Sequence, residues 1–353
     1  AVGAFSLNSN TTAADNVAIG VDAMYANTTG ASNTAVGACA LDANTTANNN
    51  TAVGNLSATG NTTGTNNSAL GFQSFVTNTT GSGNVAIGVN SLYANTTASN
   101  NTAIGLSALE ANTTGNCNTA VGMSALDTNT TGSENVAIGD DALEANTTGT
   151  ANTAVGQDAG QLLTTGNCNV FVGRGAGATV QTGANNIAIG FAAGASQTAS
   201  SGDGNISIGH LSAIKHTTGC VNVRVGPKAG YNSTTGDSNV LIGFEAGCNI
   251  TTGGCNVMIG QKSTASAASR DLEIVIAAKS SASTGKGQNT AFIDPNGGGI
   301  FAGNNSSSLS TTSDRRIKKN IVDNTTGLDK INQIKVKNFE YRTLEEITDF
   351  ENP

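Results

Sequence analysis

A glycine preceded by Val, Ile or Leu returns at a fixed interval of seventeen residues over most of this chain. The interval changes once, to nineteen, between Gly190 and Gly209. The residue four before each glycine is Asn in every complete unit, and the residue three after it is Ala or Ser. These glycines are Gly3, Gly20, Gly37, Gly54, Gly71, Gly88, Gly105, Gly122, Gly139, Gly156, Gly173, Gly190, Gly209, Gly226, Gly243 and Gly260. A period this long and this regular indicates a stack of repeated structural units.

Each unit has the pattern of short extended segments joined by turns. In the core Asn-x-Ala-Val/Ile-Gly the apolar residues alternate, as Val17 and Ile19 do, which is the period of a β-strand. A second segment such as ALDA (residues 40–43) and the turn sequence NTTG complete the unit, so seventeen residues fit two short strands and two turns. We therefore predict an all-β fold over residues 1–260, a parallel β-solenoid or β-roll of 17 residues per coil and about 16 coils.

Stacking of coils is required because one coil cannot bury its own apolar face. Coils about 4.8 Å apart make sixteen units a rod roughly 70 Å long. We expect each Val or Ile to pack on its equals above and below, and the asparagines to bond amide to amide along the axis as a structural ladder. The ladder residues are Asn16, Asn33, Asn50, Asn67, Asn84, Asn101, Asn118, Asn135, Asn152, Asn169, Asn186, Asn205, Asn222, Asn239 and Asn256.

The repeat changes type partway along the chain. Up to Gly139 the residue four after the glycine is mostly a large apolar group, and from Gly156 onward it is mainly Gly. This change predicts that the later coils narrow or turn differently. The nineteen-residue unit contains SQTASSGDGN, which we interpret as a two-residue surface bulge.

The charge distribution marks a boundary near residue 261. Residues 1–260 hold four Lys/Arg and thirteen Asp/Glu, whereas residues 261–353 hold twelve and eleven. A repeat region so poor in basic residues is unsuited to nucleic acid, and no apolar run is long enough for membrane insertion. We therefore expect a repeat domain at 1–260, a β-rich connector at 261–312 and a further segment at 313–353.

The repeats resemble a known family of adhesins. NVAIG at 84–88 and NTAIG at 101–105, each followed by x-x-Ala/Ser, are similar to the head repeats of trimeric autotransporter adhesins. The resemblance covers roughly residues 1–260 and implies a left-handed parallel β-roll in an intertwined homotrimer. A coil of seventeen residues and the position of the Asn depart from the pattern of that family. A thin, Ala-rich core also fits a trimer, since one narrow roll has little apolar area to offset chain entropy.

The connector contains strand candidates, and the segment after it carries a second resemblance. DLEIVIAA (271–278) predicts a strand, and NTAFIDPNGGGIFAG (289–303) predicts two strands joined by a turn. SDRRIKKNI (313–321) resembles the start of the intramolecular chaperone and auto-processing domain of phage tail fibres, tail spikes and endosialidases. GLDKINQIKVKNFEYR (327–342) indicates a short helix leading into a strand, so residues 313–353 are expected to be a small, partial α+β chaperone domain.

The chaperone resemblance implies self-cleavage of the Thr312–Ser313 bond in the assembled trimer. Ser313 would be the nucleophile and Lys318 its base, with Arg315, Arg316 and Lys319 supplying nearby positive charge that lowers the pKa of Lys318. The alternative is that a Ser and a Lys five residues apart occur by chance.

A repeated NTT sequence offers candidates for N-glycosylation. The alternative is a stacked turn, because coils about 5 Å apart leave no room for a glycan on each. The candidate residues, which follow an equivalent Asn10, are Asn27, Asn44, Asn61, Asn78, Asn95, Asn112, Asn129 and Asn146.

Other residue types suggest no chemistry. The six cysteines form no C-x-x-C pair, and we expect free thiols. His210 and His216 lack partners at ligand spacing and are expected in loops, so we predict no metal and no cofactor. An ice-binding array is not supported, because Thr28 and Thr29 are sequence neighbours and would point to opposite faces.

These observations predict a structural protein rather than an enzyme with substrate turnover. The first hypothesis is a homotrimeric viral tail fibre or spike shaft, on the virion tail or otherwise extracellular, that spaces or mediates attachment to a host-surface glycan or receptor. A cellular extracellular adhesin is the second, although the coiled-coil stalk and membrane anchor of bacterial autotransporters do not follow the repeats here. A self-cleaving Ser–Lys peptidase is the third.

Overall fold

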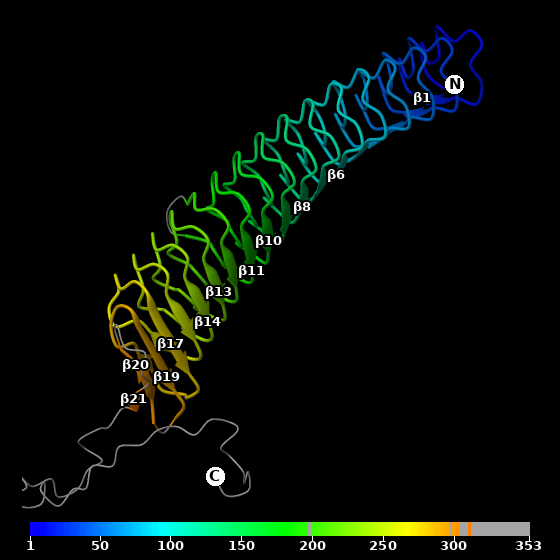
Figure 1. Cartoon of the computed structure of the whole chain (residues 1–353). Coiled ribbons are helices and arrows are strands. Elements are labelled where there is room, and N and C mark those ends of the chain that lie inside the picture. The colour runs from blue at the N-terminus through cyan, green and yellow to red at the C-terminus, as the bar shows by residue number, and fades with distance from the viewer. Residues whose placement is uncertain (197–199, 297, 304–309, 312–353) are drawn as a thin grey trace, which may run out of the picture. The chain divides into compact units, whose positions relative to one another are not determined.

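A computed structural model describes residues 1–196, 200–296, 298–303 and 310–311. Residues 1–311 form one compact unit, an elongated rod of stacked coils (Figure 1). The stacked strands are β1 (Val17–Ile19), β2 (Thr34–Val36), β3 (Thr51–Val53), β4 (Ser68–Leu70), β5 (Val85–Ile87), β6 (Thr102–Ile104), β7 (Thr119–Val121), β8 (Val136–Ile138), β9 (Thr153–Val155), β10 (Val170–Val172), β11 (Ile187–Ile189), β12 (Ile206–Ile208), β13 (Val223–Val225), β14 (Val240–Ile242), β15 (Val257–Ile259), β17 (Glu273–Ala277) and β19 (Thr290–Asp294). The other strands are β16 (Ser263–Thr264), β18 (Ser283–Thr284), β20 (Ile300–Ala302) and β21 (Ser310–Thr311).

The stack is a parallel β-solenoid with the predicted period. Val17 pairs with Thr34, and Thr34 pairs in turn with Thr51, so each strand lies beside its equivalent in the next coil. The register steps by nineteen once, from Ile187 to Ile206, and the parallel pairing continues unbroken across that step. The prediction of an all-β solenoid is therefore confirmed, and the described residues contain no α-helix.

The interior of the rod is lined by the middle residue of each strand. Ala18 in β1 is buried, whereas Val17 and Ile19 on either side of it are 46% and 44% exposed. Alternation along a three-residue strand places its first and third side chains on the face opposite to the second. Each Val or Ile lies beside its equivalent in the adjacent coil, as Ile19 lies beside Val36, but these columns run along the outside of the sheet and the core is formed by the middle residues.

The second segment of each coil is a run of turns, so the prediction of a second strand is wrong. Asp22 and Met24 have φ angles of 58° and 52°, in the left-handed region. In this conformation the N–H of Asp22 donates to Ala4 O in the preceding coil (3.0 Å). The N–H of Met24 donates to Ala40 O in the following coil (2.9 Å). The left-handed conformation costs roughly 1–2 kcal/mol for a non-glycine residue, and hydrogen bonds between coils offset this cost.

Where the repeat changes type, the backbone of the coil keeps its conformation. The large and the small side chains of the interior exchange positions. In the early coils the middle strand residue is Ala and the residue four after the glycine is large, as with Leu143. In later coils the middle residue becomes Phe171, and Gly177 has a φ of 60° where Leu143 has 52°. A Cβ on Gly177 would lie 2.4 Å from Cδ1 of Phe171. The prediction of a differently turned coil is therefore wrong, because the φ angle at this position is kept while a large residue and a small one have changed places across the core.

The parallel ladder continues beyond residue 260. Strand β17 pairs with β15, and β19 pairs with β17, again seventeen residues apart. Glu273 and Thr290 occupy the positions that Asn holds in earlier coils. The predicted strands at 271–278 and 289–303 are present as β17 and as β19 with its antiparallel partner β20. The predicted α+β segment at 313–353 lies outside the described residues.

Candidate functional site: the outer face of the sheet and the C-terminal cap

The predicted asparagine ladder lies at the entrance of each strand and is buried over most of its length. The main-chain N–H of Asn33 donates to Oδ1 of Asn16 (2.9 Å), and Nδ2 of Asn33 donates to Ala47 O (2.8 Å). The same link recurs to the end of the column, where Glu273 N–H donates to Oδ1 of Asn256 (3.0 Å). The recurring bond is thus main chain to side chain, and direct amide-to-amide bonds accompany it in part of the column, as from Asn152 to Asn135 (3.1 Å). This column satisfies polar groups of the main chain and has no reactive group.

A second asparagine ladder occupies the NTT positions, which were candidates for glycosylation. Nδ2 of Asn44 donates to Oδ1 of Asn27 (2.8 Å) and to Ala47 O (3.2 Å), and both asparagines have no exposed surface. The glycosylation hypothesis does not fit this fold, because a glycan on Nδ2 would replace the hydrogens that hold adjacent coils. The residues of this second ladder are Asn27, Asn44, Asn61, Asn78, Asn95, Asn112, Asn129 and Asn146.

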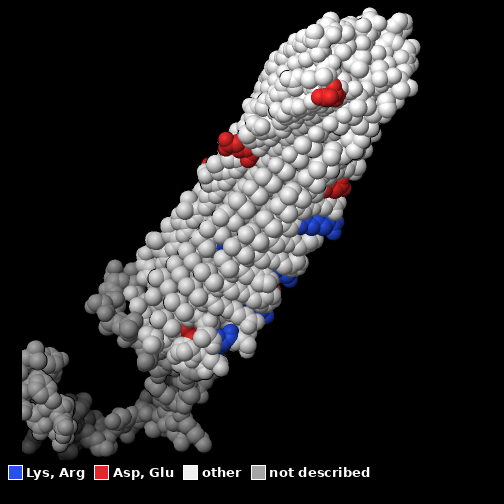
Figure 2. Space-filling model, turned by 90° about the vertical axis from the view of Figure 1, so that its right-hand side faces the viewer, with Lys and Arg blue, Asp and Glu red and all other residues white. Residues whose placement is uncertain are grey.

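The outer face of the sheet, formed by the first and third residues of each strand, is uncharged. Over β1 to β15 the only charged strand residue is Arg224, and that residue points inward. The third residue is Val, Ile or Leu in each of these strands, and Ile104 and Ile242 remain 37% and 38% exposed. Figure 2 shows a long side of the rod on which charged residues are sparse. Apolar patches on single soluble chains rarely exceed a few hundred Å², so a continuous apolar band of this length indicates an interface.

Charged side chains gather instead on the turn that follows the glycine. Glu110, Asp127 and Glu144 stand in successive coils of one column, and Nε2 of Gln161 donates to Glu144 (3.0 Å) in the next coil. Burial, followed by repulsion from Glu110, Glu144 and Asp141, raises the pKa of Asp127 to about 6. No group of three or more His, Cys, Asp or Glu within the described part of the chain is placed to hold a metal ion.

Replacing Asp127 by Asn is expected to stabilise the solenoid at neutral pH. Because folding raises the pKa of this carboxyl from 3.8 to about 6, the folded state disfavours its ionised form, and stability falls as pH rises through that window. The variant should gain about 1–2 kcal/mol at pH 7.5, allowing for solvent screening, and nothing at pH 3.5. Urea unfolding at both pH values measures the gain. Glu134→Gln, at an exposed position, is the control, and an equal gain at both pH values would refute the electrostatic explanation.

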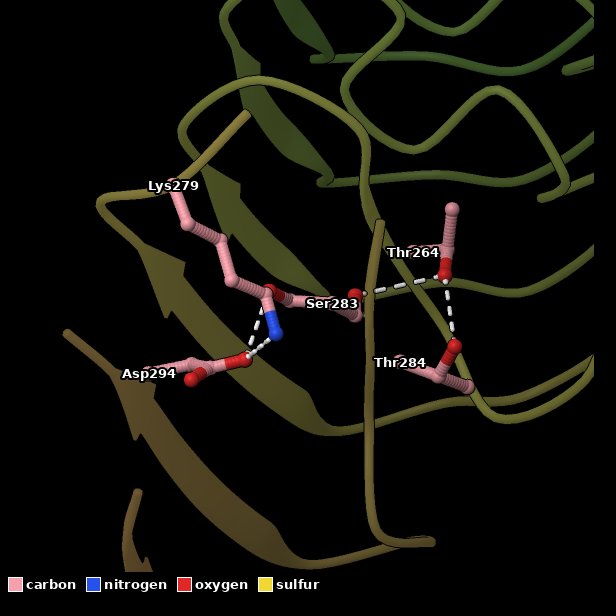
Figure 3. A network of polar contacts seen from close by, with 5 residues as sticks. All are labelled: Thr264, Lys279, Ser283, Thr284 and Asp294. Atoms are coloured by element: carbon pink, nitrogen blue, oxygen red, sulfur yellow. Dashed lines mark hydrogen bonds and ion pairs between the residues drawn. The ribbon is translucent and has the colours of Figure 1, made fainter. Parts of the chain in front are cut away.

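The last coils of the rod are closed by a polar network, the C-terminal cap, formed by Thr264, Lys279, Ser283, Thr284 and Asp294 (Figure 3). Lys279 forms an ion pair with Asp294, and Ser283 Oγ donates to Oδ2 of the same carboxylate (2.8 Å). Thr264 Oγ1 donates to Ser283 O and lies within hydrogen-bond distance of Thr284 Oγ1, both at 3.3 Å. Strands β16 and β18 pair here in parallel.

The contacts of the C-terminal cap are structural and do not form a catalytic site. Burial acts to raise the pKa of Asp294, but hydrogen bonds from Lys279 and Ser283 and the charges of Lys279 and Lys286 lower it overall. Lys279 is engaged in the ion pair with this carboxylate, and a carboxylate with a lowered pKa is a weak base. The hydroxyl of Ser283 therefore donates only to a weak base among the described residues, which does not activate it as a nucleophile.

The sequence singled out several further residues. Thr312, Ser313 and Lys318 lie outside the described residues. The six cysteines carry free thiols, as expected, and Cys117, Cys168 and Cys255 are exposed. His210 stacks on Phe191 with ring centroids 5.5 Å apart, at the surface. His216 also lies outside any strand, as expected of a loop residue, but it takes the inward position of the second asparagine ladder and is buried.

Within the described ranges, no helix has the length and the apolar character needed to cross a bilayer.

Comparisons with known proteins bear on the end of the chain. No match was found among curated proteins or among solved structures. Residues 313–352 match the family model described as chaperone of endosialidase. This match confirms the resemblance noted for the string at 313–321, whereas the resemblance of the repeats to autotransporter heads stays a prediction. A chaperone of endosialidase segment therefore follows the β-solenoid in this chain.

Proposed function

We propose that this chain is the shaft of a homotrimeric fibre of the phage tail-fibre type, which spaces or mediates attachment to a host-surface glycan or receptor. The segment at 313–352 directs the assembly of three chains, and the solenoids then lie parallel and in register. The observation that carries the proposal is the exposed apolar column of the sheet, which runs along the solenoid that precedes the chaperone match. A virion tail, or another extracellular location, follows from this function.

The outer face of the sheet has the composition that an in-register assembly requires. Each coil meets its own equivalent in the neighbouring chain, so one charged side chain would face two like charges. The face between β1 and β15 has none. Complete burial of a Val or Ile side chain contributes about 1.5–3 kcal/mol, so covering these half-exposed residues contributes roughly 1 kcal/mol per coil. Summed over the coils, this exceeds the cost of association, which is about 4–15 kcal/mol.

Introducing a charge on the outer face is expected to dissociate the assembly. Ile138 in β8 is 41% exposed, and Ile138→Lys places three ammonium groups at one level of a trimer. Analytical ultracentrifugation of the full chain should give three times the chain mass for wild type and one chain mass for the variant. Thr131→Lys is the matched control, since this exposed residue belongs to the same coil but lies in a turn half a coil away. A wild-type mass of one chain, or a trimeric Ile138→Lys variant, would refute the proposed packing.

Self-cleavage is a second candidate activity, favoured by the start of the family match at Ser313. Ser313 would attack the carbonyl of Thr312 while Lys318 takes the hydroxyl proton and delivers it to the leaving amine of Ser313 itself. Water then hydrolyses the ester that joins Thr312 to the Ser313 oxygen, which frees the Thr312 carboxylate and the Ser313 hydroxyl and separates the two fragments. Intact-mass spectrometry of the expressed chain should then find two products that divide at Thr312–Ser313, and Ser313→Ala should remain whole. A uniform uncut chain in wild type would remove this activity while leaving the fibre proposal standing, because trimerisation does not require the cut.

A further inference from the structure

Arg224 is a buried cation without a counter-charge. It is the middle residue of β13, where most coils carry Ala, and it has no exposed surface. Its Nη2 donates to Ser233 Oγ (3.1 Å) and lies 3.2 Å from Nδ1 of His216. Among the described residues no carboxylate forms an ion pair with it, and its Nε and Nη1 have no hydrogen-bond partner. An isolated buried charge is strongly unfavourable, so this arrangement calls for an anion nearby.

A small cavity lies on the other side of His216. It has a volume of about 20 Å³, and His216, Ser207, Gly194 and Ala188 are among the residues that line it. No large side chain fills the core between β11 and β12. The middle residues Ala188 and Ser207 are small, and Gly194 adds no side chain between them. A cavity of about 10–15 Å³ holds one water molecule. One monatomic occupant therefore fits here, and a polyatomic ion such as sulfate does not.

The cavity wall presents hydrogen-bond donors. Nε2 of His216 and Oγ of Ser200 have no hydrogen-bond partner. A Cβ on Gly202, another wall residue, would lie only 2.7 Å from Nε2, which places this nitrogen at the wall.

The protonation state of His216 follows from its neighbours. Burial and the charge of Arg224 lower its pKa to about 3, against a smaller opposing contribution from the main chain of Gly219, so the imidazole is neutral. Since Nδ1 faces the Nη2 donor of Arg224 and must accept, the proton of the neutral ring lies on Nε2. The described residues that line the cavity include no Asp or Glu. Unpartnered donors beside an unpaired cation, in a described lining without carboxylates, favour an anion over a metal cation.

We propose that this cavity binds one monovalent inorganic anion of the size of chloride. The anion accepts from His216 Nε2–H and from the Ser200 hydroxyl. Its charge offsets that of Arg224 across the imidazole ring, which accepts from the guanidinium on one side and donates to the anion on the other. The site fills the interior between β11 and β13, where the side chains leave it incompletely packed. A water molecule would fill the same space without balancing the charge.

Bromide is the direct probe, because it replaces chloride and scatters X-rays anomalously. Crystals of the full chain grown or soaked in sodium bromide should show an anomalous peak in the cavity, within hydrogen-bond distance of His216 Nε2. A cavity without anomalous signal, or one that holds only water at saturating bromide, would overturn the proposal. This measurement uses the wild-type chain and stands even if a variant fails to fold.

Chloride dependence of thermal unfolding is the second test. At constant ionic strength, with gluconate as the anion too large to enter, each tenfold rise in chloride above the dissociation constant should raise the unfolding temperature by roughly 2 °C. Arg224→Leu should abolish this response, and it keeps an apolar middle residue like Leu241 in the next coil. The control Arg174→Leu, at an exposed position, should retain the full response. An equal chloride response in wild type and Arg224→Leu would place the effect elsewhere and refute the site.

Discussion

Replacing Gly122 by alanine is expected to open the solenoid between two coils and to cost about 4–6 kcal/mol. Gly122 has a φ of 141°, and a Cβ there would lie 2.3 Å from the carbonyl oxygen and 2.5 Å from the carbonyl carbon of Gly139. Both contacts are main-chain atoms of the adjacent coil, so no side-chain rotation can relieve them. Separation of the coils would break the bond from Gly139 N–H to Val121 O (2.8 Å) and its neighbours in the ladder.

The effect should be local before it is global, because each coil of a solenoid contacts only its neighbours. Hydrogen exchange by mass spectrometry should show loss of protection around β7 and β8, with distant coils unchanged under mild conditions. Gly175→Asn is the matched control. Gly175 has a φ of 65°, a Cβ added to it would meet no atom within 4 Å, and Asn90 holds the equivalent position at 58°. Equal unfolding midpoints and equal protection for Gly122→Ala and wild type would contradict the proposed role of the glycine column.

The period of the sequence was enough to predict the stacking and its register. In a parallel stack of like coils, Ala35 lies beside Ala18 and Ala52 because any shift would break every glycine contact at once. The two further coils at β17 and β19 were not predicted, since Glu273 and Thr290 stand where Asn is expected and Ala277 stands where Gly is expected. The seventeen-residue interval itself is kept there and was the available signal.

The inside and outside of the sheet could not be assigned from one coil. A strand of the form Val-Ala-Ile fits either face, and ordinary hydrophobicity favours the larger residues for the core. The structure places Ala18 inside because Met24, in the left-handed conformation, is also fully buried in the core. A comparison between coils carried the missing signal. Where Phe171 replaces Ala in the middle of the strand, the residue four after the column glycine is Gly instead of a large apolar residue.

Candidate sites were harder to predict than the fold, because their residues occupy positions that periodicity treats as equivalent. Arg224 follows Val223 in a pattern that otherwise places Ala, Ser or an apolar residue inside, and nothing in the local sequence shows that its side chain is buried. The NTT positions match a glycosylation sequon and also suit a buried amide ladder. Only the stacking of adjacent coils, which brings Nδ2 of Asn44 within 2.8 Å of Oδ1 of Asn27, distinguishes the two interpretations.

Exchange of side-chain volume across the core predicts a strong coupling between Phe171 and Gly177. Phe171→Ala alone should cost about 3–5 kcal/mol through the cavity it leaves. Gly177→Leu alone should cost about 1–3 kcal/mol or more by overpacking, because its Cβ would lie 2.4 Å from Cδ1 of Phe171. The double variant restores the arrangement of the early coils, in which Ala in the strand accompanies Leu143 at a φ of 52°. It should therefore lose at least about 2 kcal/mol less than the sum of the single variants.

Urea unfolding of the four chains measures this coupling, with tryptic cleavage near β10 as a local probe that does not assume two-state behaviour. The control pairs Gly177→Leu with Leu241→Ala, a buried residue in β14 that lies four coils from β10. These two changes share no contact and should be additive within about 0.5 kcal/mol. If the Phe171 and Gly177 changes are additive as well, the later coils do not pack like the early coils with the large and small residues exchanged. A positive coupling confined to the adjacent pair would show that the core accepts either arrangement, provided that one large side chain fills each level of the stack.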